Sequence, residues 1–355
     1  MAIPVGINGF GRIGRLVARM LLRDPERFEL RLVNDLAEPE ILGRLLERDS
    51  TYGFFGSKVA ASEDGLSIDG HALRVTNERD PSAIPWKKAS VELVLEATGV
   101  FPTRSDLEKH LGAGARKVLL SAPAKGDRPL DATVVVGVND EVIAPEHTLI
   151  SNASCTTNCL APMLKVLDDR FGIEEAMATT VHAYTPSQHL LDGIDKRPTR
   201  ARSATQNIIP TSTGAAKAAV EVLPRLEGRL VAIAMRVPIP CGSVIDLSAR
   251  LNETIDRQAV NEAFREAAAG DLDGILDYTE GELVSSDIVG DPHSAIVDGS
   301  FTEILGERSV KLLGWYDNEW AYAARCVDVL DRMAGGSGSN RAAPNDMRPG
   351  AAEPR

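Results

Sequence analysis

The chain has few cysteines and no long uninterrupted apolar run. Four cysteines among 355 residues argue against a disulfide-stapled secreted scaffold and predict free thiols in a reducing compartment. The first residues show no basic region followed by an apolar stretch, so we expect no secretion signal and a cytoplasmic location. Because no apolar run approaches the roughly 20 residues that a membrane-spanning helix needs, we expect no membrane partner.

The chain also lacks an excess of positive charge. Its formal net charge of −12 opposes general affinity for nucleic acid or for an anionic membrane surface. Basic side chains that hold an anionic substrate must therefore be concentrated locally. Such a window lies at residues 196–202, with Lys196, Arg197, Arg200 and Arg202, although a solvated loop face explains it equally well.

The first half of the chain alternates short apolar strands with helical patterns. This alternation is typical of a doubly wound parallel sheet of the α/β class, and the chain length favours two domains. Strands are expected at residues 3–7, 30–34, 91–98, 117–121, 133–137 and 148–151, and a helix at 12–22. Ser105 and Glu108 predict a capping box for a further helix.

A glycine-rich turn follows the first predicted strand. Gly9, Gly11 and Gly14 form a GxGxxG motif that opens the helix, and Asp35 ends the second strand. Such glycines let backbone N–H groups approach a pyrophosphate, and the acidic residue accepts hydrogen bonds from ribose hydroxyls. Because the carboxylate would repel a 2′-phosphate, the pattern predicts NAD as the cofactor. A plain structural turn with a surface aspartate is the alternative.

A cysteine stands where a predicted strand passes into a helix. The run SNASCTTNCLAP, residues 151–162, places Cys155 at this junction. Helix N-termini carry partial positive charge and unpaired N–H groups, which stabilise the nucleophilic thiolate. A buried structural cysteine is the alternative, but Ser154 and Thr156 surround the thiol with hydrogen-bonding groups. We interpret Cys159 as structural, and the cysteine and histidine spacing predicts no metal site.

The second half has a different character. Longer strands are expected at residues 230–237 and 244–251 and a helix at 256–269, which indicates an α+β domain with a mostly antiparallel sheet. We therefore expect a Rossmann domain at residues 1–154, completed by a last helix at 319–333, and a catalytic domain at 155–318. Residues 335–355 are rich in Gly, Ser, Pro, Asn and Arg and are predicted to be a disordered tail.

Five segments together resemble a known family. They are INGFGRIGR at residues 7–15, SNASCTTNCLAP at 151–162, TSTGAAK at 211–217, RVP at 236–238 and WYDNEW at 315–320. In order and spacing, the chain resembles the phosphorylating glyceraldehyde-3-phosphate dehydrogenases. The resemblance implies NAD-dependent oxidative phosphorylation of glyceraldehyde 3-phosphate to 1,3-bisphosphoglycerate, in glycolysis or gluconeogenesis, by a homotetramer.

The resemblance assigns the chemistry to two side chains. Cys155 attacks the aldehyde, and the hemithioacetal passes a hydride to NAD to become a thioester, which inorganic phosphate releases as an acyl phosphate. A thiolate is both a good nucleophile and a good leaving group. His182 matches the histidine that accepts the hemithioacetal proton and forms a thiolate–imidazolium pair with Cys155. The joint presence of Cys155, His182, Arg236 and Asn318 disfavours a cofactor-binding protein that has lost catalysis.

The resemblance also assigns the binding residues. Thr185 and Arg236 match the site for the phosphate of the substrate. The site for inorganic phosphate matches Ser154, Thr156, Thr213 and Gly214, with Arg200 at the basic loop position. The cofactor site matches Gly9, Phe10, Gly11, Arg12, Ile13, Gly14, Asp35, Arg79, Thr98, Ser121 and Asn318. Among these, Asn318 is the amide that holds the nicotinamide carboxamide.

Three departures from the family pattern keep alternatives open. Ser187 stands where many members carry an acidic or threonine side chain near the substrate phosphate. Gly193 and Ile194 replace a Leu-Pro pair typical of strictly NAD-dependent members, so use of NADP is not excluded. Residues 291–299 and Trp320 are similar to erythrose-4-phosphate dehydrogenase, which releases an acid by hydrolysis and is the alternative activity. TSTGAAK lies in the anion-binding region itself and favours the glyceraldehyde enzyme.

Overall fold

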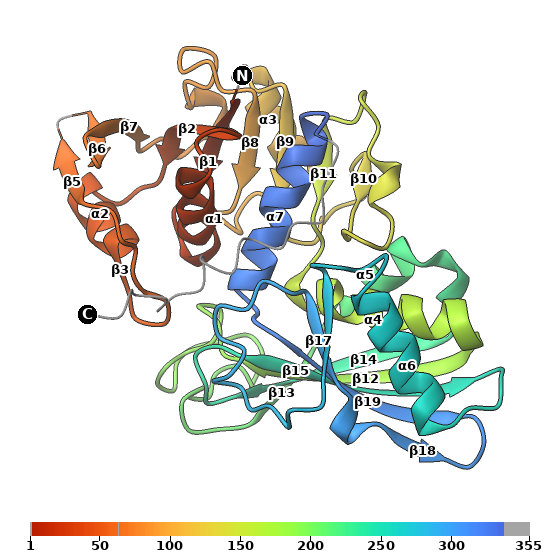
Figure 1. Ribbon diagram of the computed structural model, residues 1–355. Coiled ribbons are helices and arrows are strands. Elements are labelled where there is room, and N and C mark those ends of the chain that lie inside the picture. The colour runs from red at the N-terminus through yellow and green to blue at the C-terminus, as the bar shows by residue number, and fades with distance from the viewer. Residues whose placement is uncertain (1, 63, 337–355) are drawn as a thin grey trace.

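The computed structural model describes residues 2–62 and 64–336, and two β-sheets organise this part of the chain (Figure 1). The first sheet runs β10 (Ala132–Thr133), β11 (Leu149–Ser151), β9 (Lys117–Leu120), β8 (Leu93–Glu96), β1 (Ile3–Asn8), β2 (Phe28–Asn34), β7 (His71–Thr76), β6 (Gly65–Ile68) and β5 (Val59–Ser62). Neighbouring strands from β10 to β7 are parallel, and β6 and β5 extend the edge in antiparallel register.

Helices cover both faces of the first sheet, which explains why its strands read as nearly continuous apolar runs. Successive side chains of a strand point to opposite faces. In β8, Leu95 packs into the core shared with α1 (Arg12–Arg23) and α7 (Trp320–Met333), whereas Val94 packs into a separate core with Leu107 of α3 (Arg104–Gly112). A further helix, α2 (Pro39–Glu47), lies against β5.

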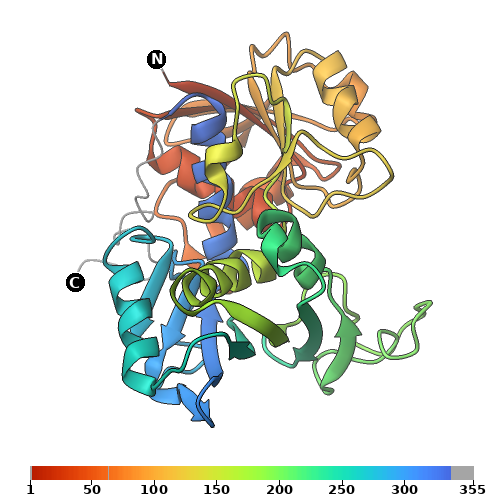
Figure 2. The ribbon, with the colours of Figure 1, turned by 90° about the vertical axis from the view of Figure 1, so that its right-hand side faces the viewer.

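The second sheet lies below the first in Figures 1 and 2. Its order is β13 (Ile209–Ser212), β14 (Leu230–Val237), β12 (Ile173–Ala183), β15 (Ser243–Leu251), β19 (Ser309–Tyr316), β17 (Ala295–Asp298) and β16 (Leu276–Thr279), with β18 (Glu303–Leu305) paired to β19. Most neighbours are antiparallel, while β12 with β14 and β16 with β17 are parallel. The predicted combination of a doubly wound sheet with an α+β half is confirmed.

One face of the second sheet is covered by helices. The central helix is α4 (Cys155–Phe171), which packs on β15, β17 and β19 and also contacts α5 (Ala215–Val222) and α6 (Arg257–Ala268). On the opposite side, Met177, Val231 and Ile233 are exposed. The short elements are β3 (Arg48–Asp49), β4 (Gly53–Phe54), η1 (Pro81–Ala83), η2 (Asp140–Val142), η3 (Pro224–Leu226) and η4 (Gly299–Phe301).

After β19 the chain returns to the first sheet. Helix α7 packs against α1 and β9, so the C-terminal helix lies in the half of the molecule that the first strands form (Figures 1 and 2). Among the described residues, no helix is both long and apolar enough to cross a bilayer. Apart from residues 335 and 336, the predicted tail lies outside the part of the chain that the structure describes.

Two local predictions were wrong. The capping box of α3 is formed by Thr103 and Asp106 rather than by Ser105 and Glu108, because Thr103 is the extended residue that precedes the first helical turn. The predicted strand at 133–137 pairs only as far as Thr133. Beyond it, the Asn139 side chain accepts a hydrogen bond from the Val135 amide and donates one to the Thr133 carbonyl oxygen. These backbone groups are therefore not available to extend the strand pairing.

Candidate active site

Cys155 is the first residue of α4, as predicted for a thiol at a helix N-terminus. Ser154 precedes it as the N-cap, and its hydroxyl accepts a hydrogen bond from the Thr157 amide at 3.1 Å. The turn requires Ala153 to adopt a left-handed conformation, with φ +53°. Such backbone strain in a non-glycine residue persists only where its surroundings impose it and is frequent at functional sites. Here Tyr322 donates to the Ala153 carbonyl at 3.1 Å.

The second sheet presents His182 to this thiol. His182 Nε2 lies 3.5 Å from Cys155 Sγ, and His182 Nδ1 lies 2.6 Å from the carbonyl oxygen of Ala183. A carbonyl only accepts, so this contact favours a proton on Nδ1, which leaves the Nε2 lone pair facing the thiol. The Arg236 guanidinium, which only donates, also contacts Nδ1 and favours the opposite tautomer. Arg236 is the partner of His182 in the β12–β14 register, and its Nη1 donates to the same carbonyl at 2.9 Å.

Burial shifts the pKa values of Cys155 and His182 in opposite directions. Burial raises the pKa of the Cys155 thiol above its usual value, although the nearby Arg236 charge opposes this. Burial, followed by the same Arg236 charge, lowers the pKa of His182 to about 3. Desolvation disfavours whichever form is charged. Burial thus opposes the charged form of each side chain, whereas the Arg236 charge favours the thiolate.

An aromatic residue that the sequence did not single out supports His182. The rings of His182 and Tyr316 meet edge to face with centroids 5.9 Å apart. The Tyr316 hydroxyl in turn contacts the hydroxyls of Thr156, at 3.0 Å, and Thr180, at 2.7 Å. Tyr316 lies in the WYDNEW segment, but nothing in the sequence indicated which of its side chains turn toward the thiol.

The residues assigned to anions lie around the same pair. Arg236 is partly exposed, and its buried Nε has no hydrogen-bond partner among the described residues. Burial lowers the pKa of Arg236, and the charge of Arg200 acts in the same direction. Arg200 Nε donates to Thr211 at 3.1 Å, and Thr213 accepts from the Ala215 amide at 3.2 Å.

The hydroxyl of Thr185 is less available than expected. It donates to Gln188 Oε1 at 3.0 Å and contacts the Ser187 hydroxyl at 2.9 Å. Thr156 is 7% exposed and is engaged with Tyr316. Of the assigned anion residues, Arg236 therefore offers the clearest unpaired donor. Thr185 must turn its O–H away from Gln188 to donate to an anion, and Thr156 can donate to one only while it accepts from Tyr316.

The glycine-rich turn has the shape that a bound pyrophosphate needs. Gly9 has φ +94°, and a Cβ on Gly14 would lie 2.0 Å from the Gly9 carbonyl oxygen, so neither position admits a side chain. Nothing lies within 4 Å of a Cβ built on Gly11, which leaves the approach to the turn open. The residues thus fit a dinucleotide held by backbone N–H groups at the start of α1.

Asp35 follows β2 beside this turn. Its carboxylate accepts the Phe10 amide at 2.7 Å and the Ala37 amide at 3.1 Å. The two bonds tie the turn to the end of β2 and hold a negative charge where a ribose is expected. Of the other residues assigned to the cofactor, Ile13 and Thr98 are half-buried and Arg79 is exposed.

A buried carboxylate under the turn was missed. Glu96 is 1% exposed and accepts hydrogen bonds from Asn8 at 2.6 Å and from the Thr98 amide at 2.9 Å. His110 lies 3.1 Å away, and its other ring nitrogen accepts from Trp86 at 3.0 Å, so the nitrogen facing Glu96 carries the proton. Ser121 donates to the Glu96 carbonyl at 3.0 Å. The only signal in the sequence was an acidic residue ending an apolar strand.

Asn318 and Arg12 are held by neighbours rather than left free. Ser243 donates to the side-chain oxygen of Asn318 at 2.9 Å, which leaves the amide N–H groups as donors. The guanidinium of Arg12 is paired with Glu319 at 2.6 Å and also with Asp49. The guanidinium of Arg12 is thus engaged by two carboxylates, while its backbone begins α1.

The described residues contain no cluster of His, Cys, Asp or Glu that could hold a metal ion. The four cysteines, Cys155, Cys159, Cys241 and Cys326, are all free, and Cys159 is fully buried. A parallel sheet with a glycine-rich turn and a flanking aspartate defines the class of NAD-dependent dehydrogenases.

Comparison with known proteins identifies the family. Residues 3–104 match the family model described as glyceraldehyde 3-phosphate dehydrogenase, NAD binding domain, and residues 154–318 match that of the C-terminal domain. A glyceraldehyde-3-phosphate dehydrogenase of Streptomyces coelicolor is 52% identical over 93% of this chain and 98% of its own length. Glyceraldehyde-3-phosphate dehydrogenase 1 of Bacillus subtilis is 51% identical over 94% of this chain and 99% of its own.

The chain therefore belongs to the glyceraldehyde-3-phosphate dehydrogenase family, and it is an NAD-dependent enzyme of that family. The resemblance seen in the five sequence segments is confirmed. Neither family model and neither of these relatives favours erythrose-4-phosphate dehydrogenase.

Proposed function

We propose that the chain oxidises and phosphorylates glyceraldehyde 3-phosphate through a thioester on Cys155. The observation that supports this most directly is the 3.5 Å contact between Cys155 Sγ and His182 Nε2. Within hydrogen-bond reach, an imidazole raises the nucleophilicity of a thiol that burial otherwise keeps protonated.

The roles follow from the geometry. As Sγ bonds to the aldehyde carbon, His182 Nε2 receives the thiol proton and returns it to the carbonyl oxygen, giving the hemithioacetal. NAD supplies the acceptor for the hydride that leaves the former aldehyde carbon. His182 takes the hydroxyl proton in that step, and a thioester remains. A phosphate oxygen then bonds to the acyl carbon, and the C–S bond breaks to return Cys155 as a thiolate.

We assign two anion sites around the thiol. Arg236 and Thr185 bind the phosphate of the substrate, and the free Nε of Arg236 supports this role. Ser154, Thr156, Thr213 and Gly214, with Arg200, bind inorganic phosphate beside the thioester. An arginine that can grip phosphate with two parallel hydrogen bonds suits the first site.

The acyl acceptor and the substrate provide the test. Steady-state rates are compared with glyceraldehyde 3-phosphate and erythrose 4-phosphate, each with and without inorganic phosphate or arsenate. The proposal expects turnover that requires phosphate or arsenate and a higher kcat/KM for the three-carbon substrate. Phosphate-independent turnover with a higher kcat/KM for erythrose 4-phosphate would refute it.

We further propose a homotetramer in the cytoplasm, with the domain division at residues 154 and 155. The exposed side of the second sheet carries Met177, Val231 and Ile233, which are 62%, 62% and 51% exposed, and Leu305 of β18 is 81% exposed. Such a set of apolar side chains is better buried between copies of the chain. Sedimentation velocity tests the assembly, and a monomer at micromolar concentration would contradict it.

A further inference from the structure

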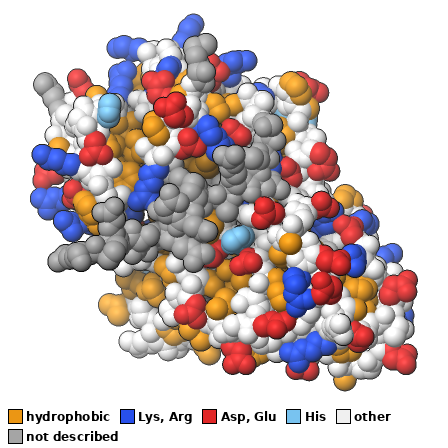
Figure 3. Space-filling model, viewed as in Figure 1, with side chains coloured by type: hydrophobic (Ala, Val, Ile, Leu, Met, Phe, Trp, Pro, Cys, Tyr) orange, Lys and Arg blue, Asp and Glu red, His pale blue; other side chains and the backbone are white. Residues whose placement is uncertain are grey.

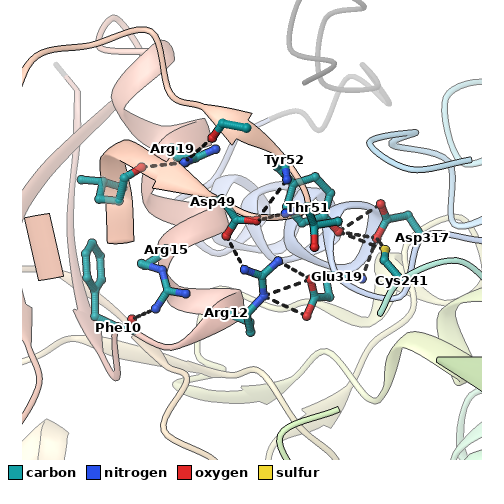
Figure 4. Close-up of polar contacts among 12 residues, drawn as sticks. Phe10, Arg12, Arg15, Arg19, Asp49, Thr51, Tyr52, Cys241, Asp317 and Glu319 are labelled. Atoms are coloured by element: carbon teal, nitrogen blue, oxygen red, sulfur yellow. Dashed lines mark hydrogen bonds and ion pairs between the residues drawn. The ribbon is translucent and has the colours of Figure 1, made fainter. Parts of the chain in front are cut away.

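The residues on either side of Asn318 in sequence, Asp317 and Glu319, belong to a largely buried polar network (Figure 4). On one side, Arg12 Nε donates to both carboxylate oxygens of Glu319 at 3.1 Å, and its Nη2 donates at 2.6 Å. The remaining arm of Arg12 pairs with Asp49 at the start of the small β3–β4 turn. Arg12 thus joins the glycine-rich turn to the residue that follows Asn318.

On the other side stands Asp317, which is 1% exposed. Its carboxylate accepts Tyr52 Oη at 2.8 Å, Cys241 Sγ at 3.2 Å, and the amides of Gly290, Glu319 and Trp320, each at 2.8 Å. The last two amides belong to the start of α7, so Asp317 caps that helix across Asn318. The Tyr52 ring also packs on Trp320, with centroids 5.4 Å apart.

Both neighbours of Asn318 are therefore anchored to segments distant in sequence. Asn318 itself is 4% exposed, and Ser243 fixes the orientation of its amide. A residue at a strand-to-helix junction is held in one geometry only if such contacts constrain it, and a preorganised amide binds a neutral carboxamide without an ordering penalty. None of these contacts serves the chemistry at Cys155 directly.

We propose that Asp317 and Glu319 are positioning residues that hold Asn318 for the nicotinamide end of the cofactor, with Arg12 coupling them to the glycine-rich turn. This inference rests on the proposed function, in which the turn binds the pyrophosphate and Asn318 binds the carboxamide. Because Arg12 is engaged by two carboxylates, it acts as a connection between the two ends of the site rather than as a ligand of the pyrophosphate.

Comparing the affinities for NAD and ADP-ribose distinguishes a role in positioning Asn318 from a purely structural role. ADP-ribose shares the adenosine, pyrophosphate and ribose of NAD but lacks nicotinamide. For Glu319→Gln we expect the Kd for NAD to rise about tenfold, the loss of one charge-assisted hydrogen bond, and the Kd for ADP-ribose to stay within about twofold. Equal weakening of both ligands, or of neither, would overturn the proposal.

Asp49→Asn is the matched control, because it removes the other carboxylate from Arg12 on the side away from Asn318. The ratio of the two dissociation constants should then remain that of the wild type. If Glu319→Gln does not fold, Tyr52→Phe is the substitute, because it removes the hydroxyl that donates to Asp317 while keeping the ring. We expect a smaller loss of affinity in this variant, again selective for NAD over ADP-ribose. A nonselective effect in Tyr52→Phe would count equally against the proposal.

A double-mutant cycle closes the test. In an Asn318→Ala background, adding Glu319→Gln should cost no further NAD affinity, since the amide to be positioned is gone. Additive losses would show that Glu319 acts independently of Asn318. Two other outcomes would instead show that the cofactor site itself is wrongly assigned: the wild type binds neither ligand, or Asn318→Ala leaves NAD affinity unchanged. Failure of the cofactor-site assignment is thereby distinguished from failure of the positioning role.

Discussion

His182 Nε2 lies 3.5 Å from Cys155 Sγ, although the two side chains come from different elements. The thiol stands at the first turn of α4, and the imidazole stands near the end of β12. Their contact depends on how α4 packs across the second sheet. A disturbance of that packing should therefore reduce catalysis before it reduces cofactor affinity.

Cys155→Ser should abolish oxidation while leaving NAD affinity nearly unchanged. A serine hydroxyl at this position is far less ionisable than a thiol, and loss of a covalent nucleophile lowers kcat on the order of 10⁴-fold or more. The cofactor turn at residues 9–14 is built from other residues. Steady-state assay and NAD titration measure both quantities, and appreciable turnover by this variant would contradict a covalent route.

His182→Asn should lower kcat by about 10² to 10⁴-fold, the usual contribution of a positioned general base. Alkylation of Cys155 by iodoacetamide near neutral pH should also slow, since no neighbouring base remains to take the thiol proton. His71→Asn, at an exposed position, is the control. An alkylation rate equal to that of the wild type would show that the two side chains do not interact.

The depressed pKa of His182 makes a prediction for stability. With a folded-state pKa of about 3 against about 6.5 in the unfolded chain, the unfolded state binds more protons between these values. The free energy of unfolding should therefore decrease as pH falls from about 6.5 toward 3. Urea denaturation of the wild type and His182→Gln across this range measures it, and the variant should show the shallower decline. Parallel curves would rule out His182 as a cause.

Asp35 should set the preference for NAD over NADP. Asp35→Asn keeps a side-chain oxygen for the Phe10 or Ala37 amide but removes the charge that repels a 2′-phosphate. We expect the ratio of kcat/KM for NAD to that for NADP to fall about tenfold or more, chiefly through better use of NADP. Equal use of both cofactors by the wild type would refute this role.

Glu96→Gln should destabilise the protein by about 2–4 kcal/mol, because an amide presents N–H groups to donors that need an acceptor. Glu92→Gln, directly before the same strand, is the control: Glu92 forms an exposed ion pair with Arg116, and its loss should cost less than about 1 kcal/mol. Chemical denaturation measures both values. Similar losses for the two variants would mean that the network around Glu96 contributes little.

Charge on the molecular surface follows the composition. In the view of Figure 3, acidic and basic side chains are interspersed over the described surface. The basic window at 196–202 resolves into individual contacts: Arg197 donates to Ser212, Arg200 donates to Thr211, and Arg202 pairs with Asp192.

The sequence by itself determined the local architecture around both motifs. The strand, glycine turn and helix at residues 3–23, and the start of α4 at Cys155, depend on residues a few positions apart, so periodicity and turn chemistry predict them. The wrong capping pair at Ser105 shows the limit of this reasoning, because several polar residues compete for the same helix start.

Only the tertiary structure decided which side chains distant in sequence come into contact and how burial shifts their pKa values. The contact of Cys155 with His182, the engagement of Arg12 by Glu319 and the burial of Glu96 all join residues that no local pattern relates. Protonation is decided there too, since desolvation depends on the assembled core rather than on sequence neighbours. For that reason the helix N-terminus alone favours a thiolate at Cys155, whereas burial in the assembled core shifts the pKa of this thiol in the opposite direction.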